Sequence, residues 1–246
     1  MKLFGLLTGT LVYSVGSIAK NRPVRKVFDL KRNTSSGNVR VQGSFNISDK
    51  EQVFYTLKTR VIAYREEING LYSQFNSGKL LLNIPFKKIS SDFADSDKQY
   101  KIYSSLGYDM EVIKQLGNVL NKLDFNSPHF INIDADVAYK LLKFLNNITD
   151  YAKTLVNYYL SDETLLHIKS SKDKLRITEI YNHLEDFITL RENCMSKIKL
   201  QIAYLESKIT RESVLTGIKE MVAYEGEIGQ DINLMSTIAI TIWSLS

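Results

Sequence analysis

The sequence predicts an all-α protein, a helical bundle of about six to seven helices with one long helix and a C-terminal helix or apolar tail. The first observation is that no glycine or proline occurs from His129 to Thr216. At a combined usage of roughly 12%, about ten would be expected, and these two residues are the costliest in a helix interior. The second is that apolar residues recur in alternating steps of three and four, the helical period. The third is that no convincing pair of strands is present.

The first helix is expected to begin at Ser48. Ser48 and Glu51 fit a capping box, in which the hydroxyl accepts an early backbone N–H and the carboxylate reaches back. Ser77-Gly78 is expected to end this helix. Its apolar stripe consists of Phe54, Leu57, Val61, Tyr64, Ile68, Leu71 and Phe75. Residues 79–89 are apolar but contain Pro85, which favours a buried extended connector.

Cap residues and breaks divide the rest of the body. Gly107 and the loop Asn126-Ser127-Pro128 interrupt it. Ser96 with Gln99 is expected to open a helix over 96–103, Asp109 to cap one over 110–123, and Asp134 to cap one over 134–160. A short helix over 162–168 should follow the break at Ser161-Asp162, and the longest helix should extend from Ser170-Ser171 to Ile209. A last helix should begin at Thr210 or Arg211, with interruptions at Gly226 and Gly229.

The C-terminal run Ile232–Leu245 is apolar apart from Asn233 and small hydroxylated residues. It is too short to span a bilayer as a regular helix. Two interpretations remain open. The run folds back into a groove of the core, or it stays exposed and becomes buried in a second subunit or in a partner.

The N-terminal residues predict targeting followed by a tether. Met1-Lys2, the apolar run Leu3–Gly16 and Ser17-Ile18-Ala19 are typical of a signal peptide over residues 1–19. A retained anchor and a soluble N-terminal element are the alternatives. Residues 20–47 are rich in lysine and arginine and are expected to form a basic flexible tether, with a polyanion-binding patch as the alternative. Residues 48–246 are expected to form a single all-helical domain.

The composition excludes several function classes. The chain has 246 residues, a formal net charge of +5 and a pI near 9.0, far from the basic density of a dedicated nucleic-acid binder. The single cysteine, Cys194, permits no intramolecular disulfide. The glycines are scattered and form no phosphate-binding loop. We therefore expect no cofactor and no specific nucleic-acid partner.

No arrangement of residues predicts catalysis or metal binding. Cys194 and His183 lie on one expected helix about 16 Å apart at about 1.5 Å rise per residue, so they cannot form a catalytic pair. Cys194 is expected to be a buried structural thiol. His129, Asp134 and Asp136 form a loose metal-like cluster with too few ligands. The chain is therefore predicted not to be an enzyme.

The remaining polar candidates have structural interpretations. His167 and His183 are lone surface or packing residues, and Glu225 and Glu227 belong to a solvated helix end. Arg191 interrupts the apolar face of the longest helix, as a structural charge pair or a snorkelling stem. Tyrosines that combine a buried ring with a polar tip suit either the core or an interface, and they are Tyr151, Tyr158, Tyr159, Tyr181, Tyr204 and Tyr224.

Two segments carry a family resemblance. Ile102–Asp124 reads IYSSLGYDMEVIKQLGNVLNKLD, and Leu141–Ile198 includes LLKFLNNITDYAKTLVNYYLS and KLRITEIYNHLEDFITLRENCMSKI. A SLGYD-type turn, an NNI-x-x-Y helix and a long helix centred on LRE follow in order. Over Ser48–Ile228 the chain resembles the virulent-strain-associated lipoprotein family of Borrelia, which includes the factor-H-binding complement regulator-acquiring surface protein.

The resemblance implies a non-enzymatic, virulence-associated helical protein at the cell surface or secreted. It implies binding of a host protein, such as a complement component or regulator in complement evasion, and dimerisation through the C-terminal segment. Partner-binding residues stay unknown. Family members carry a lipobox cysteine, whereas Leu11-Val12-Tyr13-Ser14 has Ser14 at the comparable place. The resemblance therefore does not extend to lipidation. The alternatives are a self-associating assembly protein and a polyanion-binding module that uses the basic arm.

Overall fold

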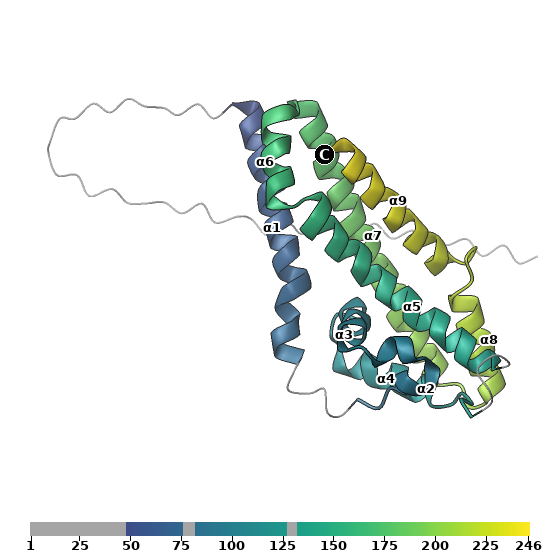
Figure 1. Cartoon of the computed structure of the whole chain (residues 1–246). Coiled ribbons are helices and arrows are strands. Elements are labelled where there is room, and N and C mark those ends of the chain that lie inside the picture. The colour runs from purple at the N-terminus through teal and green to yellow at the C-terminus, as the bar shows by residue number, and fades with distance from the viewer. Residues whose placement is uncertain (1–47, 76–81, 127–131) are drawn as a thin grey trace, which may run out of the picture. The chain divides into compact units, whose positions relative to one another are not determined.

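The computed structural model describes residues 48–75, 82–126 and 132–246, and within them it is an all-α bundle without strands (Figure 1). The predicted signal peptide, the tether, Ser14, Ser77-Gly78, Ser127-Pro128 and His129 lie outside these residues. The helices are α1 (Asp49–Phe75), α2 (Phe86–Ile89), α3 (Ser96–Ser105), α4 (Met110–Leu120), α5 (Ile133–Thr154), α6 (Asp162–Ser171), α7 (Lys174–Glu206), α8 (Arg211–Met221) and α9 (Glu227–Leu245), with a 3₁₀ turn η2 (Ser91–Ala94) and a π-helical turn η4 (Leu155–Tyr159).

Helix α7 is the 33-residue centre of the bundle and contacts α1, α4, α8 and α9. It lies in the part of the sequence without glycine or proline, so its backbone is uninterrupted. It ends at Glu206 rather than at Ile209, whose side chain is 94% exposed. Its buried residues form one stripe, namely Ile177, Ile180, Leu184, Phe187, Ile188, Arg191, Cys194, Ile198, Ile202 and Leu205.

The N-terminal capping box is confirmed. The Glu51 backbone N–H donates to the Ser48 hydroxyl at 3.3 Å, and the Ser48 N–H donates to the Glu51 carboxylate at 3.3 Å. The expected stripe from Phe54 to Ile68 is buried where the structure describes its side chains. Helix α1 packs against α7 and α3 through this stripe.

Between α1 and α4 the structure corrects two expectations. The predicted extended connector gives way to α2 at Phe86, because Pro85 stands at the N-cap, where its missing N–H is no loss. Helix α3 is capped by Asp95, which accepts the Asp97 N–H at 2.9 Å, rather than by Ser96. Asp95 and Ser96 are adjacent residues that could each cap a helix, and Asp95 occupies the N-cap position of α3.

A left-handed turn connects α3 to α4. Gly107 has φ 68° and Tyr108 has φ 53°, both in the region that glycine adopts most readily. Gly107 therefore ends α3 as predicted. Asp109 then caps α4, accepting the N–H groups of Glu111 and Val112 at 3.2 and 3.3 Å. Helix α4 stops at Leu120, three residues before the expected end.

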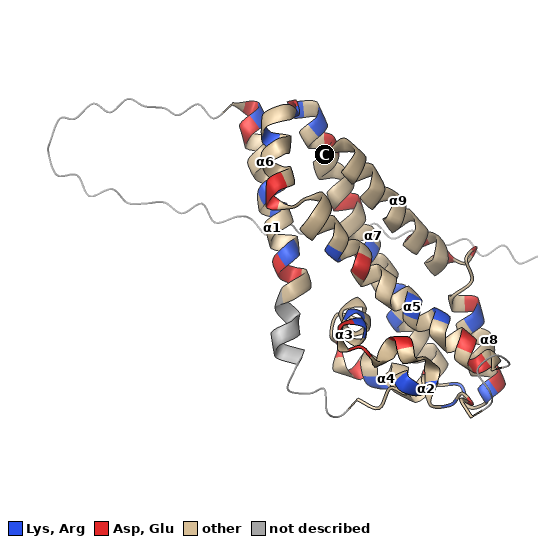
Figure 2. Ribbon diagram, viewed as in Figure 1, with Lys and Arg blue, Asp and Glu red and all other residues tan. Residues whose placement is uncertain are grey.

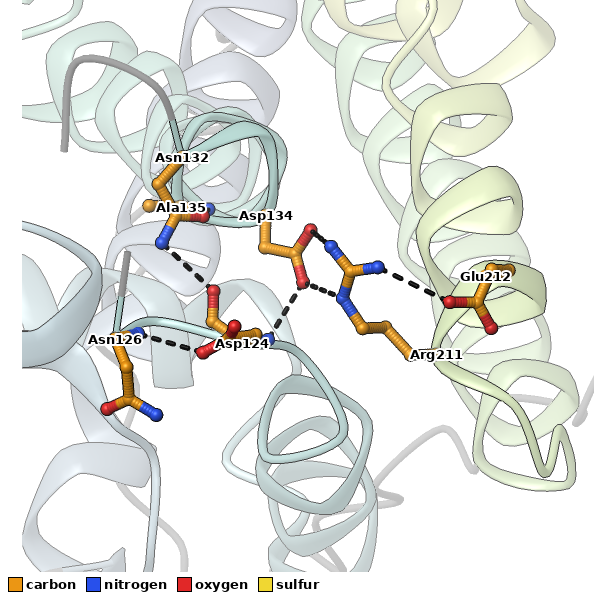
Figure 3. Close-up of polar contacts among 7 residues, drawn as sticks. All are labelled: Asp124, Asn126, Asn132, Asp134, Ala135, Arg211 and Glu212. Atoms are coloured by element: carbon orange, nitrogen blue, oxygen red, sulfur yellow. Dashed lines mark hydrogen bonds and ion pairs between the residues drawn. The ribbon is translucent and has the colours of Figure 1, made fainter. Parts of the chain in front are cut away.

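Helix α5 is not capped by Asp134, which corrects the sequence prediction. The N-cap is Asn132, whose side chain accepts the Ala135 N–H at 3.0 Å. Asp134 stands one position inside the helix and is fully buried. Its carboxylate forms two bonds of 2.7 Å with Arg211 at the start of α8 and accepts the Asp124 N–H at 2.8 Å (Figure 3). Asp134 thus ties α5 to α8 and to the segment after α4.

The C-terminal run folds back onto the bundle, the first of the two interpretations left open. It forms α9, which lies along α7 in Figure 1 and also contacts α5, α8 and η4. Gly226 is the N-cap of α9, so it marks a boundary as predicted. Gly229 is different, because it lies inside the helix and is buried. Within the described residues, no helix has the combined length and hydropathy needed to cross a membrane.

Candidate interaction surface

Helix α9 has an inner face that belongs to the core. Its members recur in steps of four and three and pack against α7, α5 and η4. Ile242 and Met235 are completely shielded from solvent. The inner face consists of Ile228, Ile232, Met235, Ala239 and Ile242. Burial of this face fixes the orientation of the helix and hence the residues it presents to solvent.

The opposite side of α9 is exposed and carries no charge. Between Ile232 and Ser246 the sequence has no lysine, arginine, aspartate or glutamate, and Figure 2 shows most of α9 without charged residues. Leu234, Ile240 and Trp243 are each at least half exposed. We define the α9 outer face as the exposed residues Leu234, Thr237, Ile240, Trp243 and Ser244. An exposed apolar surface of this kind is a mark of protein–protein contact sites.

A cleft lies at the C-terminal end of the α9 outer face. It has a volume of about 680 Å³. The Trp243 ring packs beside the Tyr159 ring, with centroids 6.0 Å apart and planes inclined by 32°. Tyr158 is 72% exposed and Trp243 is 61% exposed. The lining residues are Tyr158, Tyr159, Glu163, Thr164, His167, Lys172, Trp243 and Ser246.

The π-helical turn η4 places the two cleft tyrosines. The Leu160 N–H donates to the Leu155 carbonyl at 2.8 Å, a five-residue step that inserts one extra residue into the turn. Such turns occur mostly as single insertions in α-helices and are frequent at functional sites. Leu155 and Val156 stay buried while Tyr158 is turned to solvent. The sequence prediction of one regular helix from Asp134 to Leu160 is therefore corrected at its last turn.

Arg65 of α1 holds this turn in place. Its Nη2 donates to the carbonyls of Val156 and Leu160 at 2.9 and 3.1 Å. Its Nη1 forms an ion pair with Asp162 at 3.0 Å. A π turn leaves carbonyls without their usual helical donors, and a guanidinium supplies several donors in a fixed plane. One side chain from a distant helix therefore stabilises the irregular end of α5 and the start of α6.

The polar candidates of the sequence analysis are not gathered into one metal-ligating cluster among the described residues. Glu163, His167 and Lys172 add mixed charge at the rim of the cleft. His167 and His183 are not near Cys194 in any contact that the structure records. Asp136 pairs with Lys140 of its own helix at 2.7 Å, and Glu227 pairs with Lys197 at 2.6 Å. No group of three or more metal-ligating side chains is found in the described part of the chain.

Cys194 is a buried structural thiol, as predicted. It is completely shielded from solvent on the inner stripe of α7. Burial raises the pKa of the Cys194 thiol from 9.0 to about 12. A thiol that stays protonated at neutral pH is a poor nucleophile, so we expect low reactivity from Cys194 in the folded state.

Raised pKa values predict a loss of stability at alkaline pH. Burial also raises the pKa of Tyr64 and of Tyr103 from 10.0 to about 12. The folded state keeps these protons and the Cys194 proton after the unfolded chain begins to release them near pH 9. The free energy of unfolding should therefore be unaffected by these groups below about pH 9 and fall as the pH rises toward 12. Urea unfolding at pH 8, 10 and 11 measures this free energy. A free energy of unfolding that stays level or rises with pH would contradict the raised pKa values of these three groups.

The tyrosines divide between core and surface. Tyr158, Tyr204 and Tyr224 are more than half exposed, whereas the other three are partly buried against the core. Only Tyr158 and Tyr159 line the cleft. Arg191 is 5% exposed and forms no ion pair among the described residues, so the predicted charge pair is not found there.

The sequence analysis named the C-terminal run and the two tyrosines separately, but not the cleft that they form together. The available signals were the charge-free run after Asp231 and the pair Tyr158-Tyr159 at the end of a long helix. Their proximity depends on the fold. Comparison with known proteins adds nothing further: no family model matches the chain, and no curated protein is similar to it.

Proposed function

We propose that this chain is a non-enzymatic binding protein that contacts a partner protein through the α9 outer face and the adjoining aromatic cleft. The observation that carries the proposal is the half-exposed apolar surface at Ile240 and Trp243, on a helix firmly anchored by its inner face. Interface hot spots are enriched in tryptophan and tyrosine, and the centres of interfaces are depleted of charge. The α9 outer face and the adjoining cleft combine exposed aromatic side chains with a charge-free helix surface.

The partner in this proposal is a host protein, and the protein acts at the cell surface or after secretion. Support comes from the resemblance of Ile102–Asp124 and Leu141–Ile198 to a family of surface-displayed proteins, some of which bind complement components or regulators. Complement evasion is the role that follows from such a partner. The basic residues 20–40 would separate the domain from the surface that carries it.

Self-association is the second candidate function. A surface without charge can face its own copy across a twofold axis without bringing like charges together. The α9 outer face meets this condition, because no charged residue occurs between Ile232 and Ser246. Self-association and binding of a different protein use the same surface, so one set of variants tests both.

The variant Ile240→Asp should weaken partner binding by about tenfold or more, because a charge at the centre of an apolar contact leaves a desolvated carboxylate. Ile240 is 53% exposed, so the fold should tolerate the change. The matched control is Ile209→Asp, which places the same charge at a 94% exposed isoleucine outside α9. Binding of the purified chain to a panel of host serum proteins at micromolar concentration, together with its mass by light scattering, gives the measurement.

Three outcomes decide the question. Binding or self-association lost in Ile240→Asp and kept in Ile209→Asp supports the surface. Equal loss or equal retention in the two variants refutes it. A monomeric wild-type chain that binds no serum protein refutes both functions. Deletion of Ile232–Ser246 is not a suitable test, because it removes the inner face of α9 and with it part of the core.

A further inference from the structure

The aromatic cleft, which is lined from η4, α6 and α9, carries ring surface that the core does not bury. Trp243 is 61% exposed and Tyr158 is 72% exposed. The partly buried Tyr159 packs beside Trp243, with ring centroids 6.0 Å apart, and so supports the tryptophan ring at the cleft. An aromatic face that stays in water on a well-anchored helix is suited to a ligand that has an apolar face of its own.

Three polar side chains of the cleft have no partner among the described residues. Glu163, His167 and Lys172 line the cleft, and none of their side chains forms a hydrogen bond or ion pair within the described part of the chain. Glu163 and Lys172 therefore do not pair with each other, although both belong to one lining. By contrast, the neighbouring Asp162 is paired with Arg65 at 3.0 Å. The cleft thus offers a ligand one carboxylate acceptor, one ammonium donor and one imidazole.

The two charges of the cleft oppose an ionic ligand of either sign. Glu163 repels an anion and Lys172 repels a cation, and the two side chains share the same lining. A wholly apolar ligand would cover both groups without giving them hydrogen bonds, which costs free energy. The ligand that suits this lining is uncharged, has one apolar face for the rings, and carries hydrogen-bonding groups around its edge.

A sugar ring combines these properties. The C–H groups on one face of a pyranose are apolar and pack on an aromatic ring, while several hydroxyls surround its edge. A hydroxyl both donates and accepts, so adjacent hydroxyls of one sugar can serve the Glu163 carboxylate and the Lys172 ammonium together. A nucleobase also stacks on aromatic rings, but each group on its edge is fixed as a donor or as an acceptor. The polar lining therefore favours a sugar over a base.

The cleft has room for such a ligand. Its volume of about 680 Å³ lies within the range of about 300 to 1,000 Å³ that is typical of small-molecule sites. Such sites combine aromatic walls with a few polar groups that fix the orientation of the ligand. Because Tyr158 and Trp243 are largely exposed, the terminal sugar of a longer glycan can enter from solvent while the rest stays outside.

We propose that the aromatic cleft binds an uncharged sugar residue, which stacks on Trp243 and forms hydrogen bonds with Glu163 and Lys172. This inference rests on the proposed function and deepens it, because it assigns the chemical group that the partner protein places in the cleft. The partner contacts the α9 outer face with its polypeptide and the cleft with the sugar of an attached glycan. A free saccharide should therefore occupy the cleft without the partner.

The intrinsic fluorescence of the full chain reports this binding directly, because Trp243 is its only tryptophan. The ligands are methyl glycosides of glucose, galactose, mannose and N-acetylglucosamine, together with lactose, each up to about 10 mM because one ring makes few contacts. At least one should change the Trp243 emission saturably. The same ring with a carboxylate or an ammonium group on its exocyclic carbon should bind about tenfold more weakly or less.

The variants Glu163→Gln and Glu66→Gln form a matched pair. Each replaces an exposed glutamate by its amide, but Glu66 lies on α1 and does not line the cleft. Glu163→Gln should weaken saccharide binding by about tenfold, the factor expected for a hydrogen bond to a charged group, and Glu66→Gln should leave it unchanged. Trp243→Leu removes the stacking ring and should abolish the saturation-transfer NMR signal of the bound sugar protons.

The sugar inference and the proposed function can fail separately. No saturable change with any saccharide of the panel overturns the sugar inference, as does adenosine or a charged sugar that binds as tightly as the best neutral one. Equal saccharide binding by wild type, Glu163→Gln and Trp243→Leu overturns it as well. Loss of partner binding in Ile240→Asp would still support the proposed function in each of these cases. Saccharide binding without any protein partner would instead keep the sugar site and refute the partner.

Discussion

Replacing Asp134 with alanine is expected to lower the free energy of unfolding by about 2 to 4 kcal/mol. The carboxylate is fully buried and accepts three hydrogen bonds, two from Arg211 and one from the Asp124 N–H (Figure 3). Its loss removes the link between α5 and α8 and leaves the Asp124 N–H without its acceptor. The guanidinium of Arg211 is partly exposed and can rehydrate, which keeps the effect below that of an isolated buried charge.

Asp136→Ala is the matched control for this experiment. Asp136 lies two residues along the same helix and forms only a half-exposed pair with Lys140. Such pairs contribute about 0.2 to 0.5 kcal/mol. Urea unfolding monitored by circular dichroism compares the two variants with the wild type. If Asp134→Ala and Asp136→Ala destabilise the chain equally, the buried contact has no special role.

Replacing Ile242 with aspartate should destabilise the protein by about 3 kcal/mol or more. Ile242 is fully buried on the inner face of α9. A carboxylate at this position must either lose its hydration or displace the helix from α7. The resulting loss is a large fraction of a typical folding free energy of about 5 to 15 kcal/mol.

Ile240→Asp makes the same chemical change two residues earlier, on the α9 outer face. We expect it to leave the midpoint of thermal unfolding close to that of the wild type, because the new carboxylate stays hydrated. Differential scanning calorimetry of both variants gives the comparison. A stable Ile242→Asp protein would mean that α9 is dispensable for the fold, contrary to its packing.

Several helix starts could be predicted from local signals in the sequence. The capping box at Ser48, the Asp109 cap and the Thr210 start all depend on contacts within four residues, and the structure has each of them. Asp134 was assigned wrongly because its decisive partner, Arg211, is 77 residues away in the chain. The neighbouring Asn132, spaced three residues before Ala135, was the local signal for the true cap.

The interaction surface was predictable only in outline. The inner-face spacing of α9 is helical, but Gly229 suggested an interruption. The structure shows another role, because a Cβ at Gly229 would lie 2.3 Å from the Ala223 carbonyl oxygen. Glycine permits the close approach of the helix to the preceding turn. The cleft depends on η4, and the donors that stabilise η4 come from Arg65. The local sequence at Leu155–Tyr159 does not predict this contact, because Arg65 lies in a different helix.

The contacts of Arg65 give α1 a mechanical role. This helix follows directly on residues 1–47, so any load that reaches the domain from that side enters through α1. Arg65 passes the load to the carbonyls of Val156 and Leu160 and to Asp162. Displacement of α1 would withdraw two donors from the turn that orients Tyr158 and the ion pair from the start of α6. We therefore expect the position of α1 and the orientation of Tyr158 to depend on each other through the guanidinium group of Arg65.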